Sequence, residues 1–140
     1  MNKEKIFRQL SLLNKYLKEL NSLKNIPFDE FEENSITRAA AERLLQVAIE
    51  TVQNIGNHII ASRGYRNPKD YADIFRVLEE EKILPHDFSE SLQQMAKFRN
   101  RLVHIYWDID IKKVYDIIQN NLEDFERFAQ IILEEMVKEN

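Results

Sequence analysis

The 140-residue sequence contains no cysteine, two glycines and three prolines. The lack of cysteine excludes disulfide bonds, thiolate zinc sites and a cysteine nucleophile. Because glycine and proline are scarce while Leu, Ile, Glu and Lys abound, the composition favours long helices over a turn-rich β fold. A chain of this length buries one core, so we expect residues 1–140 to form a single domain.

Long uncharged apolar runs are missing too. The first twenty residues mix charges among their apolar positions and offer neither the apolar core nor the small-residue cleavage site of a secretion signal. No stretch approaches the roughly 18 uncharged apolar residues of a membrane span. The sequence therefore predicts a soluble cytoplasmic protein that does not bind a membrane.

A positive net charge is also lacking, since the formal charge is -4. Phosphate binding depends on Lys and Arg, which argues against a protein that contacts nucleic acid over its whole surface. Two short basic clusters remain, KFRNR at residues 97–101 and RGYRNPK at residues 63–69. Any contact with RNA must therefore be local, and the second cluster taken alone is typical of a solvated face.

Apolar residues recur at helical spacing in five segments. A first helix carries one stripe from Ile6 to Leu20, and residues 25–34 then break the pattern. A long second helix begins at a cap on Asn34 or Ser35, has Ile36 on its inward face, runs to about residue 62 and stops at Gly64. Inside it, Gly56 costs up to about 1 kcal/mol relative to Ala, which a close contact between helices would explain.

The second half of the chain continues this pattern. A shorter third helix opens at residues 67–68, with Tyr71 on its apolar face, and a fourth begins near Ser89. After a break at residues 107–110, a long last helix runs from Ile111 to Met136. Four long helices and one short helix predict an all-α fold, an antiparallel helical bundle.

The densest polar cluster lies at residues 97–107. On a helix, Lys97, Arg101 and His104 share one face, and Asn100 stands one turn behind His104. Arg99 lies five residues before His104, about 140° away on an ideal helix. This separation suits a site where two copies of the helix meet and each subunit contributes residues.

This cluster combines residue types that act on phosphate. Histidine titrates near neutral pH, and the planar fork of arginine binds phosphate. Arg99, His104 and the hydroxyl of Tyr106 fall within eight residues, and Arg99 and Tyr106, seven apart, share a stripe. The ordinary alternative is a surface or hydrogen-bonded histidine, with Arg99 and Arg101 as ion-pair partners of glutamates.

The pattern Arg99-Asn100-x-x-x-His104-x-Tyr106 resembles the signature of HepT-like toxins of the HEPN superfamily: Arg, four intervening residues, His, one residue, Tyr. Residues 36–61, 71–84, 98–110 and 114–129 also resemble that family in order and spacing. The resemblance thus covers about residues 1–135. It implies a homodimeric HEPN bundle that cleaves an RNA substrate, either tRNA or mRNA, without a metal or other cofactor. It also implies that the partner is a nucleotidyltransferase antitoxin of the MntA type, encoded by a neighbouring gene.

The resemblance implies a role for each motif residue. His104 is the acid or base, and Arg99 stabilises charge on the phosphate, since cleavage through the 2′-hydroxyl needs both functions. Asn100 binds the phosphate or orients the imidazole, and Tyr106 accepts AMP from the antitoxin, which silences the toxin. Supporting positive charge comes from Lys97 and Arg101.

Other polar residues are weaker candidates. His58 is predicted to be a helix residue with a hydrogen-bonded ring. His86 is predicted to lie in a loop without acidic or histidine neighbours at metal spacing, so we expect no metal site. A polar stripe on the second helix either faces solvent or lines a dimer cleft. It consists of Arg43, Gln46, Glu50, Gln53 and Asn57.

A second function is compatible with the same helices. A catalytically silent helical adaptor that binds a nucleotidyltransferase subunit would show similar apolar stripes. It would need only its interaction surface and would tolerate the loss of His104 and Arg99, whereas the nuclease needs both.

Overall fold

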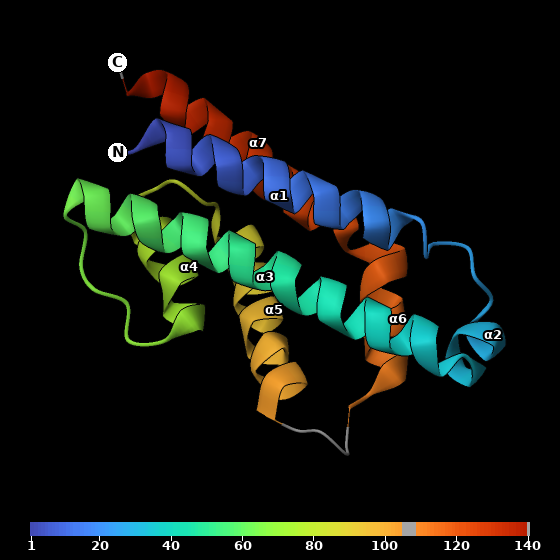
Figure 1. Cartoon of the computed structure of the whole chain (residues 1–140). Coiled ribbons are helices and arrows are strands. Elements are labelled where there is room, and N and C mark those ends of the chain that lie inside the picture. The colour runs from blue at the N-terminus through green and yellow to red at the C-terminus, as the bar shows by residue number, and fades with distance from the viewer. Residues whose placement is uncertain (105–108, 140) are drawn as a thin grey trace.

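The computed structural model describes residues 1–104 and 109–139, which form seven helices and no strand (Figure 1). This all-helical architecture confirms the fold class expected from composition and spacing. The helices are α1 Lys3–Asn21, α2 Phe28–Glu33, α3 Ser35–Arg63, α4 Tyr71–Glu80, α5 His86–His104, α6 Ile111–Asn120 and α7 Leu122–Lys138.

Helix α3 is the centre of the bundle, because it contacts each of the other six helices. Helices α1 and α7 lie side by side along one flank of α3, and α4 and α5 pack on the other (Figure 1). The chain direction in α1 is opposite to that in α3 and α7. Both ends of the chain lie at the same end of the bundle, where the Lys3 ammonium donates to the Glu139 carbonyl oxygen at 2.6 Å.

Apolar side chains from all seven helices form the core. Phe75 of α4 and Phe128 of α7 meet edge to face, with ring centroids 6.3 Å apart. On α5, Phe98 and Leu102 point inward and are 7% and 8% exposed. Their burial fixes the rotation of α5, and so decides which of the neighbouring polar residues face outward.

The sequence signals at the two ends of α3 are confirmed. The Asn34 side chain accepts a hydrogen bond from the Thr37 backbone N–H at 3.1 Å. Gly64 ends the helix in the left-handed conformation, with φ of 69°. Inside α3, a Cβ added to Gly56 would lie 2.8 Å from Cγ2 of Ile74. The predicted close contact therefore exists, and it is the approach of α4 to α3.

The predicted single last helix is two helices, and the predicted break after the first helix contains a further short helix. The last helix divides at Asn121, whose backbone (φ -121°, ψ 6°) ends α6 and precedes α7. The interruption is so short that the apolar spacing of α6 continues into α7. Residues 25–34 contain the short helix α2, which begins directly after its N-cap residue, Pro27.

Two other boundaries shift, and two side chains predicted to face inward are exposed. Helix α4 starts at Tyr71 rather than at residues 67–68, and α5 starts at His86, before Ser89. Ile36 is 81% exposed, because the first turn of α3 lies at the edge of the molecule beside the short α2 (Figure 1). Tyr71 is 46% exposed because it stands in the first turn of α4.

Among the described residues, no helix combines the length and the apolar character of a membrane-spanning segment.

Candidate active site

The last turns of α5 carry five of the six residues predicted for the site, and this segment is helical up to His104. Because Phe98 and Leu102 occupy the inward face, the polar residues divide into two groups. Arg99 and Asn100 are half-buried, whereas the three predicted to share a face are exposed. The exposed residues are Lys97, Arg101 and His104.

Arg99 is fixed on several sides. Its Nε and Nη2 both donate to Oε2 of Glu50 on α3, at 2.9 and 2.5 Å, and its Nη1 donates to Oδ1 of Asn100 at 3.2 Å. The guanidinium carbon lies 5.0 Å from the centroid of the Tyr71 ring, a cation–π contact. The Arg99 side chain is 15% exposed. Arg99 is therefore held between α3 and α4 and cannot move freely in solvent.

Glu50 is itself supported. Gln46, one turn earlier on α3, donates through Nε2 to the same Oε2 atom at 3.1 Å. Burial raises the pKa of the Glu50 carboxyl, but hydrogen bonds from Gln46 and Arg99 outweigh burial and lower it overall. Glu50 therefore stays ionised near neutral pH, and the ion pair with Arg99 persists.

His104 lies apart from Arg99 within one chain. It is exposed in the last turn of α5, whereas Arg99 faces α3 and α4. No hydrogen bond or ion pair joins the two side chains in the described part of the chain. The structure thus agrees with the angular separation predicted from their spacing. Tyr106 lies outside the described residues.

The two basic clusters differ in how their charges are used. In the cluster at residues 63–69, both arginines are bound in structural ion pairs, Arg63 to α7 and Arg66 to α4. In the cluster at residues 97–101, Lys97 and Arg101 form no ion pair with residues 1–104 or 109–139. The partners of Arg63 are Glu135 and Glu139, and those of Arg66 are Asp73 and Glu80.

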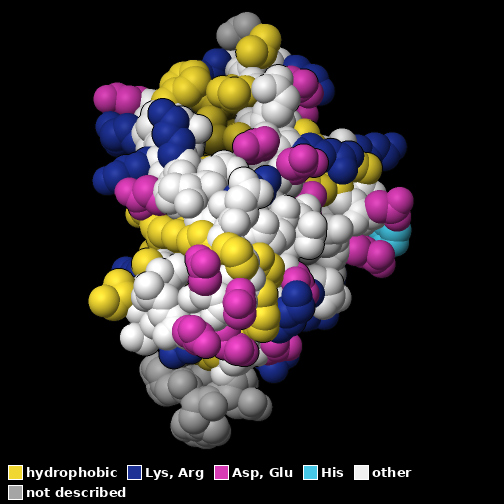
Figure 2. Space-filling model, turned by 90° about the vertical axis from the view of Figure 1, so that its right-hand side faces the viewer, with side chains coloured by type: hydrophobic (Ala, Val, Ile, Leu, Met, Phe, Trp, Pro, Cys, Tyr) yellow, Lys and Arg dark blue, Asp and Glu magenta, His cyan; other side chains and the backbone are white. Residues whose placement is uncertain are grey.

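The face shown in Figure 2 has Lys and Arg side chains interspersed with Asp and Glu, without a continuous basic surface. This agrees with the formal charge of -4. Locally available positive charge on α5 is therefore the feature that distinguishes the cluster at residues 97–101.

The residues of the polar stripe on α3 differ in their exposure and contacts. Arg43 and Asn57 are exposed, Glu50 binds Arg99, and Gln53 is 2% exposed. Nε2 of Gln53 has no hydrogen-bond partner among the described residues. The sequence spacing places Glu50 on this stripe but does not indicate that it is the partner of Arg99. The available signal was a single carboxylate among the polar residues of this stripe.

The other histidines have structural contacts. The Asn2 backbone N–H donates to Nε2 of His58 at 3.3 Å, so the expectation of a hydrogen-bonded ring is confirmed. The prediction for His86 was wrong, because it begins α5 and has acidic neighbours. Its Nδ1 lies 2.8 Å from Glu79 and its Nε2 3.1 Å from Glu90. These contacts raise the pKa of the His86 imidazole.

Metal-ligating atoms also gather at this point, since ligand atoms of His86, Asp87 and Glu90 lie within 4.8 Å of one another. All three side chains are exposed, and both ring nitrogens of His86 already face carboxylates. The contacts of His86 at this point are therefore surface ion pairs with Glu79 and Glu90.

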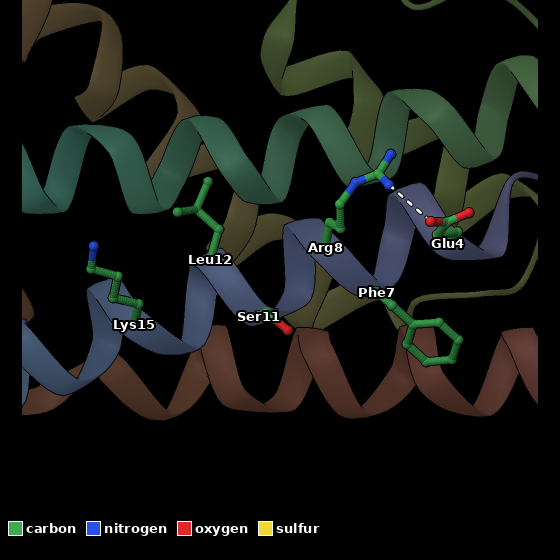
Figure 3. A pocket seen from close by; sticks show the side chains of 6 residues that line it. All are labelled: Glu4, Phe7, Arg8, Ser11, Leu12 and Lys15. Atoms are coloured by element: carbon green, nitrogen blue, oxygen red, sulfur yellow. Dashed lines mark hydrogen bonds and ion pairs between the residues drawn. The ribbon is translucent and has the colours of Figure 1, made fainter.

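A hollow on the outer face of α1 is formed by side chains of that helix alone (Figure 3). Phe7 and Leu12 project from α1, and Arg8 turns back to Glu4 with a 3.2 Å contact. The hollow contains no residue of the α5 cluster and is separate from the candidate site. Its lining residues are Glu4, Phe7, Arg8, Ser11, Leu12 and Lys15.

Comparison with solved structures establishes the fold as that of a HEPN toxin. The chain superposes on the tri-AMPylated HEPN toxin of Shewanella oneidensis, solved in complex with an MNT antitoxin, with a TM-score of 0.85. The match covers 92% of this chain and 96% of the other, at 24% sequence identity. The family model described as ribonuclease HepT-like matches residues 13–132. The chain therefore belongs to the HepT-like family.

Two relatives named as nucleases share part of the sequence. The chain is 32% identical over 88 residues to the mRNA nuclease HepT of Shewanella oneidensis. The aligned region covers 63% of this chain and 66% of that protein. The chain is 29% identical over 126 residues to the tRNA nuclease HepT of Aphanizomenon flos-aquae, covering 89% of this chain and 84% of the relative.

Proposed function

We propose that the chain is an endoribonuclease toxin that acts as a single domain in the cytoplasm and cuts mRNA or tRNA without a metal. The observation that carries this proposal is an arginine held in a fixed orientation on the same helix as an exposed histidine. The names of two relatives, an mRNA nuclease and a tRNA nuclease, support the class of substrate.

The proposed reaction needs only side chains of this protein and water. His104 takes the proton of the RNA 2′-hydroxyl, and the 2′-oxygen then attacks the adjacent phosphorus. The bond from phosphorus to the 5′-oxygen breaks, that oxygen receives a proton from water, and a 2′,3′-cyclic phosphate remains. Arg99 stabilises the negative charge that builds up on the phosphate oxygens. Asn100 contacts Arg99 through Oδ1, so its amide N–H groups are available to the phosphate, and Lys97 and Arg101 attract the RNA backbone.

We further propose that two copies complete the site. Within one chain Arg99 faces α3 and α4, whereas His104 faces solvent. A symmetric homodimer that brings two α5 helices together would bring both groups to a shared cleft.

Control of the enzyme is proposed to act at Tyr106. This tyrosine lies two residues beyond His104, so a nucleotide attached to its hydroxyl would place bulk and negative charge at the substrate phosphate position. One structural relative is a tri-AMPylated toxin in complex with an MNT antitoxin. We therefore propose that an MntA-type nucleotidyltransferase transfers AMP from ATP to Tyr106. Intact-mass measurement after incubation with this partner and ATP should show AMP-sized additions to wild type and none to Tyr106→Phe.

Expression in bacteria tests the proposed nuclease against the silent adaptor. Wild type should arrest growth, and His104→Ala should relieve the arrest, because the base is removed. His86→Ala is the matched control, since it removes another exposed α5 histidine and should leave the arrest intact. Arrest that persists with His104→Ala while the protein is equally abundant would contradict the nuclease assignment.

A further inference from the structure

We propose that Glu50 is a positioning residue for Arg99: it fixes the guanidinium in the orientation that meets the scissile phosphate. The inference rests on the proposed ribonuclease function and adds a residue of α3 to a site otherwise built from α5. In the structure the Glu50 carboxylate contacts Arg99 and Gln46.

Three hydrogen bonds meet at one carboxylate oxygen of Glu50. One oxygen, Oε2, accepts hydrogen bonds from two nitrogens of Arg99 and from the amide of Gln46. Gln46 and Glu50 are one turn apart on α3, the central helix, so the acceptor stands on a rigid element. The Tyr71 ring packs against the guanidinium from α4. Together these contacts restrict both the direction and the plane of the guanidinium.

The remaining donors of Arg99 are sufficient for a phosphate. Arginine has five N–H donors, and Glu50 and Asn100 engage three of them. Two donors, one on each terminal nitrogen, stay available for phosphate oxygens. A positive charge oriented before the reaction stabilises the transition state better than one that must reorganise during it.

The charge of Glu50 should affect the cleavage rate and the affinity for RNA in opposite directions. A carboxylate beside Arg99 repels the RNA phosphate, so it weakens ground-state binding while it improves orientation. Replacing Glu50 by a neutral residue should therefore slow cleavage without weakening RNA binding. An ion pair with a purely structural role would predict loss of stability with no such division.

The experiment measures single-turnover cleavage of a defined RNA by wild type and Glu50→Gln. We expect the cleavage rate of Glu50→Gln to fall roughly 10-fold or more, since misplacement by about 1 Å can cost 10²-fold. The Kd for the same RNA with 2′-O-methyl groups throughout, which cannot be cut, should not rise. Glu135→Gln is the matched control, because it neutralises the comparably buried partner of Arg63 and should cleave at the wild-type rate.

A double-mutant cycle shows whether Glu50 acts through Arg99. In the Arg99→Ala background, Glu50→Gln should cause no further loss of rate. A full additional loss there, or an unchanged rate in Glu50→Gln, overturns the positioning role. If Glu50→Gln fails to fold, Gln46→Ala removes only the supporting amide and should give a smaller loss in the same direction; an unchanged rate in that variant also overturns the role. Wild type that does not cut RNA overturns the proposed function itself, which separates the two failures.

Discussion

Gly56→Ala tests the packing of α3 against α4, where two effects of opposite sign compete. Alanine in a helix interior stabilises by up to about 1 kcal/mol relative to glycine. The added Cβ, however, would lie 2.8 Å from Cγ2 of Ile74 and 3.3 Å from Cδ1 of Leu78. Ile74 is 4% exposed and its γ-carbon sits on a β-branched side chain, so it cannot simply swing away.

Overpacking of this kind costs roughly 2–3 kcal/mol, the upper part of the usual range. We therefore expect Gly56→Ala to lower the free energy of unfolding by about 1–2 kcal/mol net and Tm by about 5 °C. Urea unfolding followed by circular dichroism measures the first quantity, and a thermal melt measures the second. A variant more stable than wild type would refute the reasoning.

A second substitution identifies the cause. Ile74→Ala removes the atom that Gly56→Ala would approach most closely, so in this background Gly56→Ala should be neutral or stabilising. Gly64→Ala is the contrasting control. It has open space but a φ of 69°, so it should lose about 1 kcal/mol through backbone strain whether or not Ile74 is present. Equal losses for Gly56→Ala in both backgrounds would show that the contact is not responsible.

Three further predictions concern ion pairs and assembly. The hydrogen bond to Glu79 and the charges of Glu79 and Glu90 raise the folded-state pKa of His86 above 6.5. The contribution of His86 to stability is therefore complete below about pH 6.5 and is lost as the pH rises through the raised pKa. Urea unfolding should show that His86→Gln loses more stability relative to wild type at pH 5.5 than at pH 9, and an equal loss at both would contradict this. Asp73→Asn removes the negative charge and one of the two oxygens that accept hydrogen bonds from Arg66, at 2.7 and 2.9 Å. The substitution should cost about 2 kcal/mol, below the usual cost of breaking a buried pair, because the Arg66 side chain is 40% exposed. Urea unfolding indistinguishable from wild type would show that this pair contributes nothing. Light scattering at micromolar concentration should give twice the 16.8 kDa chain mass, and a monomer mass would count against the proposed homodimer.

Much of the fold could be predicted because helix signals are local. The cap at Asn34, the stop at Gly64 and the apolar spacing of the long helices all lie in short stretches of sequence. The division at Asn121 could not be read in the same way, because the apolar positions stay in register across it. Ile36 shows a second limit, since periodicity assigns a side chain to a face but does not say where the neighbouring helices end.

In the candidate site, too, relations within one helix could be predicted and contacts between helices could not. Residues within one helix, such as Arg99 and His104, could be placed relative to each other by their spacing alone. The contact between Arg99 and Glu50 joins residues 49 positions apart, and the packing of Tyr71 on Arg99 depends on where α4 begins. Contacts of this kind follow from the packing of helices, which no local pattern specifies.

Cleavage of RNA by the purified chain, free of any partner and in excess EDTA, tests the central claim most directly. The account predicts products with 2′,3′-cyclic phosphate ends. His104→Ala should lower the rate by roughly 10²-fold or more, and Arg99→Ala by a comparable factor. Cleavage that requires added magnesium, or that survives both substitutions, would contradict the proposed mechanism.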